Sequence, residues 1–249
     1  MKIVAIIPAR YGSKRFPGKP LAQIAGKPMI QRVYEQASKS SNLDDVYVAT
    51  DDERITACVE AFGGKAVMTS LEHPSGTDRV YEAATRIGLA PDDIVINIQG
   101  DQPLFPPGLV ESLVEPLQAD PGISMTTLYY PVYGAEEALN ANHVKVVMDN
   151  KGFALYFSRA PIPYHREGGA SPRYRKHLGV YAYRMEFLSR FTRLPVGLLE
   201  KTEKLEQLRA LENGFRIKMI ESPVDSVEVD IEADIGRVEG LLSTGVSDN

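Results

Sequence analysis

The sequence contains a single cysteine, Cys58, among its 249 residues. One cysteine cannot form an intrachain disulfide or a zinc site built from thiolates, and nothing points to an oxidising compartment. The apolar run at residues 3–7 is too short for a signal peptide, and no stretch approaches the ~18 apolar residues of a membrane span. We therefore expect a cytoplasmic protein that does not associate with membranes.

Basic residues are not in excess either. The chain has 28 Lys and Arg against 33 Asp and Glu, for a formal net charge of −5. A general nucleic-acid binder needs a basic surface to attract phosphates, so that class of partner is not expected. Any basic cluster in this chain is therefore local, and a local cluster is a candidate site.

Strand and helix patterns alternate with short connections through the first half of the chain. Short apolar runs rich in β-branched residues predict buried strands, and apolar residues at helical spacing predict the helices between them. The alternation predicts parallel β-α-β units, and so an α/β protein with a doubly wound, mostly parallel, Rossmann-like sheet. The expected strands are 3–7, 46–49, 66–68 and 94–98, and the expected helices are 29–37, 51–62, 76–87 and 109–117.

The pattern changes after about residue 122. Residues 125–132 and 177–183 are strand-like, 144–157 indicates a hairpin, and the polar segment 165–175 indicates a mobile loop. Leu205, Leu208 and Leu211 predict a helix, 215–220 a strand, and 235–242 a final helix. The simplest organisation is one domain over residues 1–249, with an inserted antiparallel lobe at about 122–183.

The first candidate site is a basic loop that directly follows the first strand. It superficially resembles a Walker loop, but five residues separate Gly12 from Gly18, and Pro20 stands where a magnesium-binding hydroxyl would be. A P-loop kinase is therefore disfavoured. Fixed cations and free backbone N–H groups in this position suit a polyphosphate, although a solvated basic surface loop would look the same. The cations are Arg10, Lys14, Arg15 and Lys19.

Two further segments lie where strand ends meet helix starts. Residues 75–79 (Ser-Gly-Thr-Asp-Arg) open a helix, and residues 99–103 (Gln-Gly-Asp-Gln-Pro) leave the fourth strand. The first can be a simple helix cap. The second can hold Mg²⁺ against a nucleotide. An Asp in a turn can instead do no more than accept hydrogen bonds from nearby backbone amides. Taken alone, each segment leaves both interpretations open.

Together these segments resemble the signature of the sugar-acid cytidylyltransferases, and most of all the branch that activates 3-deoxy-manno-octulosonate (KDO). The similar segments follow one another in order over nearly the whole chain. They are residues 7–13, 16–21, 75–79, 99–101, 154–163, 177–181 and 205–209.

The resemblance implies a fold of the nucleotide-diphosphosugar transferase type and a specific reaction. CTP and KDO would give CMP-KDO and diphosphate, with Mg²⁺ as the cofactor, for lipopolysaccharide biosynthesis. It also implies a homodimer, for which the antiparallel lobe is the natural surface because its strands would otherwise expose an edge.

The resemblance also implies roles for individual residues. Lys19, Asp101 and Asp230 would be catalytic, and the two aspartates would hold the metal. Arg159 could pair bidentately with the sugar's carboxylate, while Asp78 and Asp234 are expected to cap helices. The implied nucleotide site is Ala9, Arg10, Ser13, Lys14, Arg15, Lys19, Ser75, Arg79, Gln99 and Gly100. The implied sugar-acid site is Arg159, His177, Tyr181, Glu206 and Gln207.

Some positions depart from the family pattern, and other functions stay open. Gln102 stands where the family usually has Glu, 226–229 (Ser-Val-Glu-Val) precedes Asp230 in place of a small pair, and the 165–176 loop is shorter than in many relatives. A related sugar acid, such as sialic acid or 8-amino-KDO, is the nearest alternative substrate. A GT-A-like glycosyltransferase would want an Asp-x-Asp pair, which is missing at Asp101. A nucleotide sensor would not need both Asp101 and Asp230.

Overall fold

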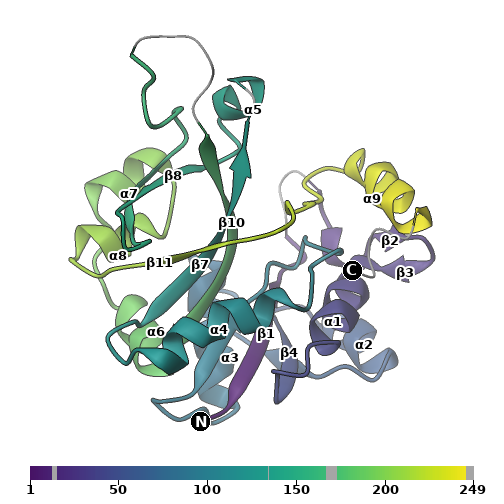
Figure 1. Cartoon of the computed structure of the whole chain (residues 1–249). Helices are drawn as coiled ribbons and strands as arrows, with labels where there is room; N and C mark the ends of the chain where they lie inside the picture. Colours follow the sequence, from purple (N-terminus) through teal and green to yellow (C-terminus); the bar gives the residue numbers. More distant parts are fainter. Residues whose placement is uncertain (13–15, 134, 167–172, 245–249) are drawn as a thin grey trace. The chain divides into compact units, whose positions relative to one another are not determined.

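Helices alternate with strands through the first hundred residues of the computed structural model, which describes residues 1–12, 16–133, 135–166 and 173–244 (Figure 1). The chain divides into two units. Unit 1 consists of Met1–Glu111, Arg184–Glu186 and the segment from Ser226 onward, and unit 2 consists of Ser112–Tyr183 and Phe187–Asp225.

The sheet of unit 1 has four parallel strands, in the order β6-β1-β4-β5. β1 (Ile3–Ala9) lies between β6 (Ile94–Asn97) and β4 (Asp45–Thr50), and β5 (Ala66–Met68) pairs with β4. Val4, Ala5, Ile6 and Ile7 are buried, as expected for a central strand covered on both faces. Because the strands are parallel, β1 and β6 both end at the same edge of the sheet.

The helices of unit 1 begin where the sequence supplies capping groups. Asp52 accepts from the Arg54 amide at the start of α2 (Glu53–Ala61), and Ser75 accepts from the Asp78 amide at the start of α3 (Gly76–Arg86). α9 (Asp234–Ser243) lies beside the small hairpin of β2 (Gln23–Ile24) and β3 (Lys27–Pro28) (Figure 1). Glu239 of α9 accepts a hydrogen bond from the Ala25 amide in the turn of this hairpin. The remaining elements are α1 (Met29–Ser38) and a 3-10 turn, η1 (Lys19–Leu21).

Unit 2 is built mainly from antiparallel pairs. β7 (Met125–Val132) pairs with β10 (Tyr174–Arg184), β10 with β8 (Lys145–Met148), and β8 with β9 (Ala154–Ser158). β11 (Lys218–Glu221) pairs with β7 in parallel. The helices around these strands are α4 (Leu109–Ala119, which begins in unit 1), α5 (Ala135–Leu139), α6 (Met185–Phe191), α7 (Leu198–Glu203) and α8 (Leu208–Glu212).

An irregularity in β10 positions part of the candidate site. The register of β10 against β7 shifts between His177 and Tyr181, and Gly179 in this interval has φ +69°. A positive φ favours glycine because it has no Cβ to collide with the backbone. Beyond the bulge, Tyr181 stacks on Tyr183, which packs on Phe187 and Phe191 in the core of unit 2.

The predicted α/β fold class and mostly parallel sheet are confirmed, and two local predictions are wrong. Tyr174 and Arg175, expected in a mobile loop, begin β10, because alternate residues of this charged segment are buried against β7. Leu205 is not helical, because Lys204 has φ 55° and ends α7, and three residues separate Lys204 from the start of α8. Within the described residues, no helix is long and apolar enough to cross a membrane.

Candidate active site

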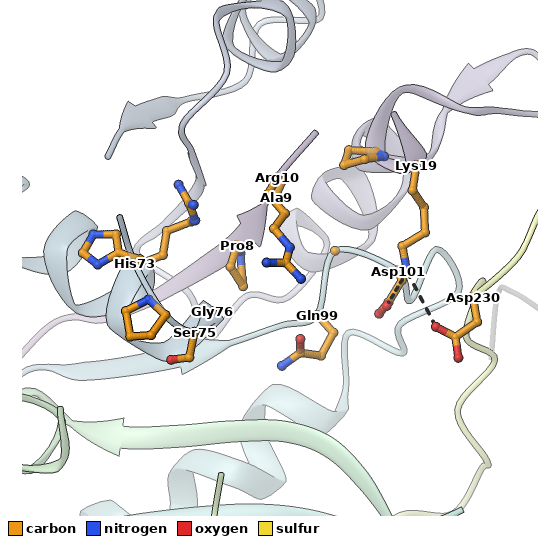
Figure 2. A pocket seen from close by; sticks show the side chains of 14 residues that line it. Pro8, Ala9, Arg10, Lys19, His73, Ser75, Gly76, Gln99, Asp101 and Asp230 are labelled. Carbon is orange, nitrogen blue, oxygen red and sulfur yellow. Dashed lines mark hydrogen bonds and ion pairs between the residues drawn. The ribbon is translucent and has the colours of Figure 1, made fainter. Parts of the chain in front are cut away.

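A pocket of about 310 Å³ lies in unit 1 where β1 and β6 end and α3 begins (Figure 2). Ligands of open α/β sheets bind at this edge because the connections between strands gather there. The lining residues come from five separate segments of the sequence. They are Pro8, Ala9 and Arg10; Lys19 and Pro20; His73, Pro74, Ser75, Gly76 and Arg79; Gln99, Gly100 and Asp101; and Asp230.

Gly100 is required by the close approach of two chain segments. A Cβ atom at this position would lie 2.9 Å from the carbonyl oxygen of Pro8. Real Cβ atoms do not come so near, so any other residue would push the turn after β6 away from the end of β1. The predicted nucleotide-binding turn therefore keeps its place because residue 100 has no side chain.

Lys19 joins the two predicted metal-binding aspartates. Its ammonium donates to Asp101 Oδ2 at 2.8 Å and to the Val229 carbonyl at 2.9 Å, and Asp230 Oδ1 lies 3.9 Å away (Figure 2). The Lys19 side chain is only 15% exposed. The structure thus brings together one cation and two carboxylates from three distant parts of the sequence.

Asp78 and Asp234 lie in the first turns of α3 and α9, but neither is the capping residue: Ser75 caps α3, and the N-cap position of α9 is Ala233, which makes no side-chain cap bond. Ser75 Oγ donates to Asp78 Oδ2 at 2.7 Å while accepting from the Asp78 amide, a reciprocal arrangement at the start of α3. Asp234 accepts from the amides of Asp230 and Ile231 at 2.8 and 3.0 Å, just before α9. Asp234 therefore fixes the backbone of Asp230.

The guanidinium of Arg79 is fixed by groups at the ends of β4 and β5. Its two terminal nitrogens donate to Thr69 Oγ1 and to Asp51, each at 2.5 Å, and the residue is 4% exposed. The Thr69 hydroxyl donates in turn to the Thr50 carbonyl. Arg79 therefore forms part of the pocket lining with a guanidinium that Thr69 and Asp51 hold in place.

His73 also lines the pocket, although the sequence analysis gave it no role. Its ring is paired with Glu82 of α3. Although burial raises the pKa of Glu82, hydrogen bonds from the Ser70 amide, His73 and Arg86 lower it to about 2. Glu82 thus ties the segment from Ser70 to His73 to α3. The one available signal was the position of His73, just before the helix entry at Ser75.

The predicted sugar-acid residues all lie in unit 2, and three of them adjoin one another. His177 Nδ1 lies 3.5 Å from Gln207 Nε2, and the His177 and Tyr181 rings lie 5.3 Å apart. Burial lowers the pKa of His177 from 6.5 to about 3, so its imidazole is neutral at pH 7. Burial, together with the charge of Glu206, raises the pKa of Tyr181 well above its ordinary value.

Glu206 is held next to a buried ion pair. Arg209 donates bidentately to Glu200 at 2.6 and 2.8 Å, and its guanidinium also lies 3.6 Å from Glu206. The glutamate of α8, Glu212, accepts from the Leu199 and Glu200 amides at the start of α7. The turn that carries Glu206 and Gln207 is therefore fixed at both ends.

Arg159 is held by backbone carbonyls. Its guanidinium donates to the carbonyls of Glu203, Ala141 and Lys204 at 2.8, 2.9 and 3.5 Å. Lys145, which the sequence analysis missed, is fully buried, and its ammonium donates to the Arg159, Asn140 and His143 carbonyls. Burial and the nearby charge of Arg159 lower the pKa of Lys145. These acceptors carry no net charge, but the Glu203 carboxylate, which accepts from the Arg159 amide, interacts electrostatically with both cations.

Comparison with known proteins agrees with this geometry. The family model described as cytidylyltransferase matches residues 4–220. The chain belongs to the cytidylyltransferase family. The match includes every predicted nucleotide and sugar residue and stops before Asp230. Ser13, Lys14 and Arg15, which the family signature also implicates, lie outside the described residues.

Individual cytidylyltransferases are similar along their whole length. A 3-deoxy-manno-octulosonate cytidylyltransferase of Desulfatibacillum aliphaticivorans is 58% identical, over 97% of this chain and 99% of that protein. An 8-amino-3,8-dideoxy-manno-octulosonate cytidylyltransferase of Shewanella amazonensis is 56% identical, over 97% and 99%. A structure of CMP:2-keto-3-deoxy-manno-octonic acid synthetase complexed with CTP superposes with a TM-score of 0.92 at 45% identity, covering 98% of this chain and all of that one.

The low pKa of His177 predicts a specific acid sensitivity for this cytidylyltransferase. Between pH 6.5 and 3 the unfolded chain binds a proton at this residue that the folded chain does not, so this contribution to stability is complete above pH 6.5 and is lost as the pH falls. Between pH 7 and pH 5 the loss amounts to about 2 kcal/mol. Between pH 7 and pH 5, the free energy of unfolding in urea should fall by about 2 kcal/mol less for His177→Gln than for the wild type.

His165 supplies the control, because it is exposed. His165→Gln should keep the wild-type pH dependence. Equal pH dependence in His177→Gln and the wild type would contradict the prediction.

Proposed function

We propose that this cytidylyltransferase transfers the cytidylyl group of CTP to KDO, which gives CMP-KDO and diphosphate for lipopolysaccharide biosynthesis. The observation that carries the proposal is the pocket of unit 1, where cations and two carboxylates gather at the ends of β1 and β6. The full-length similarity to a protein named for this activity supports it. We place the reaction in the cytoplasm, where CTP is available.

The proposed reaction is an in-line displacement at the α-phosphorus of CTP. The anomeric hydroxyl of the sugar forms the new P–O bond and loses its proton, while the bond to the departing diphosphate breaks. The protein does little covalent work, so its contribution is positioning and charge neutralisation. Arg10 and Lys19 line the pocket and would supply positive charge for the phosphates, and Gln99 lines the same pocket (Figure 2).

The residues around Lys19 fit a divalent cation. Asp101, Asp230 and the Val229 carbonyl already surround one positive charge, and hard oxygen donors of this kind suit Mg²⁺. Two carboxylates suffice, since Mg²⁺ keeps several waters and also binds phosphate oxygens. When bound, the ion would offset charge on the α-phosphate and lower the pKa of the attacking hydroxyl. Asp101 and Asp230 are the residues that would hold it.

The sugar acid would bind in unit 2. Arg159 keeps its charge for the sugar's carboxylate because its hydrogen bonds go to neutral carbonyls. Gln207 can bond to a sugar hydroxyl beside the neutral ring of His177, and Tyr181 and Glu206 adjoin them. KDO has both the carboxylate and the hydroxyls that these groups would recognise.

An amino-substituted KDO is the second candidate substrate. Relatives named for 8-amino-KDO are 54–56% identical to this chain, nearly the same as those named for KDO. The carboxylate of Glu206 would suit an ammonium group on the sugar as well as a hydroxyl.

Diphosphate release tests the proposed function. Purified protein with Mg²⁺ should release diphosphate with CTP and KDO, and much more slowly with UTP or ATP, because backbone carbonyls and Gln99 can read the exocyclic amine of cytosine. A panel with 8-amino-KDO and sialic acid in place of KDO identifies the substrate. Comparable turnover with UTP would contradict the nucleotide assignment, and release with 8-amino-KDO alone would make that sugar the substrate.

The two aspartates are tested by charge removal. Asp101→Asn and Asp230→Asn should each lower turnover at least ~100-fold, because the phosphates then lack a full metal site. Asp234→Asn is the matched control: it removes a carboxylate four residues from Asp230 but keeps an acceptor for the two amides. It should retain most of the activity. Near-normal turnover of Asp230→Asn at limiting Mg²⁺ would refute the two-aspartate site.

We further propose that the protein is a homodimer that associates through the antiparallel lobe. β9 pairs on one side only, with β8, among the strands of the described residues, and its Leu155 is 61% exposed. An unpaired strand edge that carries apolar residues is a natural interface.

Sedimentation should give twice the chain mass of 27.5 kDa at micromolar concentration. Leu155→Glu should shift the protein toward the monomer, because it places a charge in the interface. Leu71→Glu, at an exposed leucine of unit 1, should leave the dimer intact. A stable monomer in the wild type would argue against the lobe as an interface.

A further inference from the structure

Thr127 of β7 makes two hydrogen bonds that have no place in the mechanism described so far. The residue is fully buried. Its hydroxyl oxygen lies 2.6 Å from the Val180 carbonyl and 3.0 Å from His177 Nε2. A carbonyl can only accept, so the single hydroxyl hydrogen points to Val180. The Thr127 oxygen must then accept from His177, which requires the imidazole hydrogen to be on Nε2.

This assignment also determines the other side of the imidazole. A neutral ring with its hydrogen on Nε2 has a lone pair on Nδ1. The group that faces Nδ1 at 3.5 Å is the amide of Gln207, so that amide must turn its NH₂ toward the ring. Its carbonyl oxygen is then directed away from His177, as an acceptor. Burial keeps the ring neutral at pH 7, so the arrangement persists under working conditions.

We propose that Thr127 is a positioning residue of the sugar-acid site. By fixing the Nε2–H tautomer of His177 it sets the orientation of the Gln207 amide, so that Gln207 offers a carbonyl acceptor to a hydroxyl donor of a 3-deoxy-ulosonic acid. The proposal rests on the proposed function, in which the sugar acid binds at Gln207 and beside His177.

The bulge in β10 makes the arrangement possible. The register shift between His177 and Tyr181 lies where Val180 must turn its carbonyl toward Thr127. The preceding residue, Thr126, provides a matched comparison. It is also fully buried, and its hydroxyl donates to the Leu113 carbonyl at 2.7 Å. Successive residues of a strand face opposite sides of the sheet, and the bond of Thr126 is to α4 and not to His177.

Steady-state kinetics of four proteins test the proposal: wild type, Thr127→Val, Thr127→Ser and Thr126→Val. Each valine variant removes one buried hydroxyl, so both should lose stability. Thr127→Val should also raise the KM for KDO about tenfold, the worth of one buried hydrogen bond, with the KM for CTP unchanged. Thr127→Ser retains the hydroxyl, so its KM for KDO should equal that of the wild type. Thr126→Val should also have the wild-type KM for KDO. An unchanged KM in Thr127→Val, or an equal rise in Thr126→Val, would overturn the proposal.

Nitrogen NMR of the wild type gives a test that does not depend on the folding of the Thr127 variants. The two nitrogens of a neutral imidazole have distinct shifts, and the signal of His177 is assigned by its absence in His177→Gln. The spectrum should show hydrogen on Nε2. Hydrogen on Nδ1 would overturn the proposal. A different result would refute the proposed function itself: no release of diphosphate from CTP by the wild type with any sugar acid of the panel.

Discussion

The ammonium of Lys19 is the constraint on which the pocket of unit 1 depends. It lies between carboxylates contributed by the end of β6 and by the segment before α9, which would otherwise repel each other. Backbone bonds support the arrangement, because the Val229 amide donates to the Asp101 carbonyl at 2.9 Å. Both carboxylates are partly exposed, at 27% and 36%, so solvent weakens the attraction and leaves the oxygens accessible to a further cation.

Unit 2 achieves fixed geometry by another route. Its polar groups are oriented by uncharged partners: Arg159 and Lys145 by backbone carbonyls, and His177 by a threonine. Groups that are fixed before a ligand arrives lose less conformational entropy when it binds. The hydrogen-bond partners of the Arg159 guanidinium are neutral, while the Glu203 carboxylate nearby accepts from the Arg159 amide. Unit 1 thus orients the groups of its pocket with opposed charges, whereas unit 2 orients Arg159, Lys145 and His177 with neutral hydrogen bonds and uses an ion pair only beside Glu206.

Much of unit 1 could be predicted from the sequence, because its signals are local. The buried run of β1 and the cap at Ser75 each depend on a few adjacent residues. The meeting of Asp101 with Asp230 could be expected only from the family resemblance, since no local pattern links residues so far apart.

The sequence carries no comparable local signal for the details of unit 2. Thr127 looks like any strand threonine, and Lys145 like an exposed strand lysine, until the fold buries them. Tyr174 and Arg175 were misassigned because charged neighbours conceal the alternation of β10. In each case the deciding partner comes from a distant segment: His177 for Thr127, the Arg159 carbonyl for Lys145 and β7 for the start of β10.

The division of unit 1 along the sequence has a consequence for biosynthesis. Its first 111 residues contain Lys19 and Asp101, but Val229 and Asp230 belong to the segment from Ser226 onward. A growing polypeptide folds from its N-terminus as it is translated. All of unit 2 is therefore synthesised before the segment that adds Asp230 to the pocket of unit 1. A ribosome that stalls within unit 2 leaves a nascent chain in which the ammonium of Lys19 has only Asp101 for a partner.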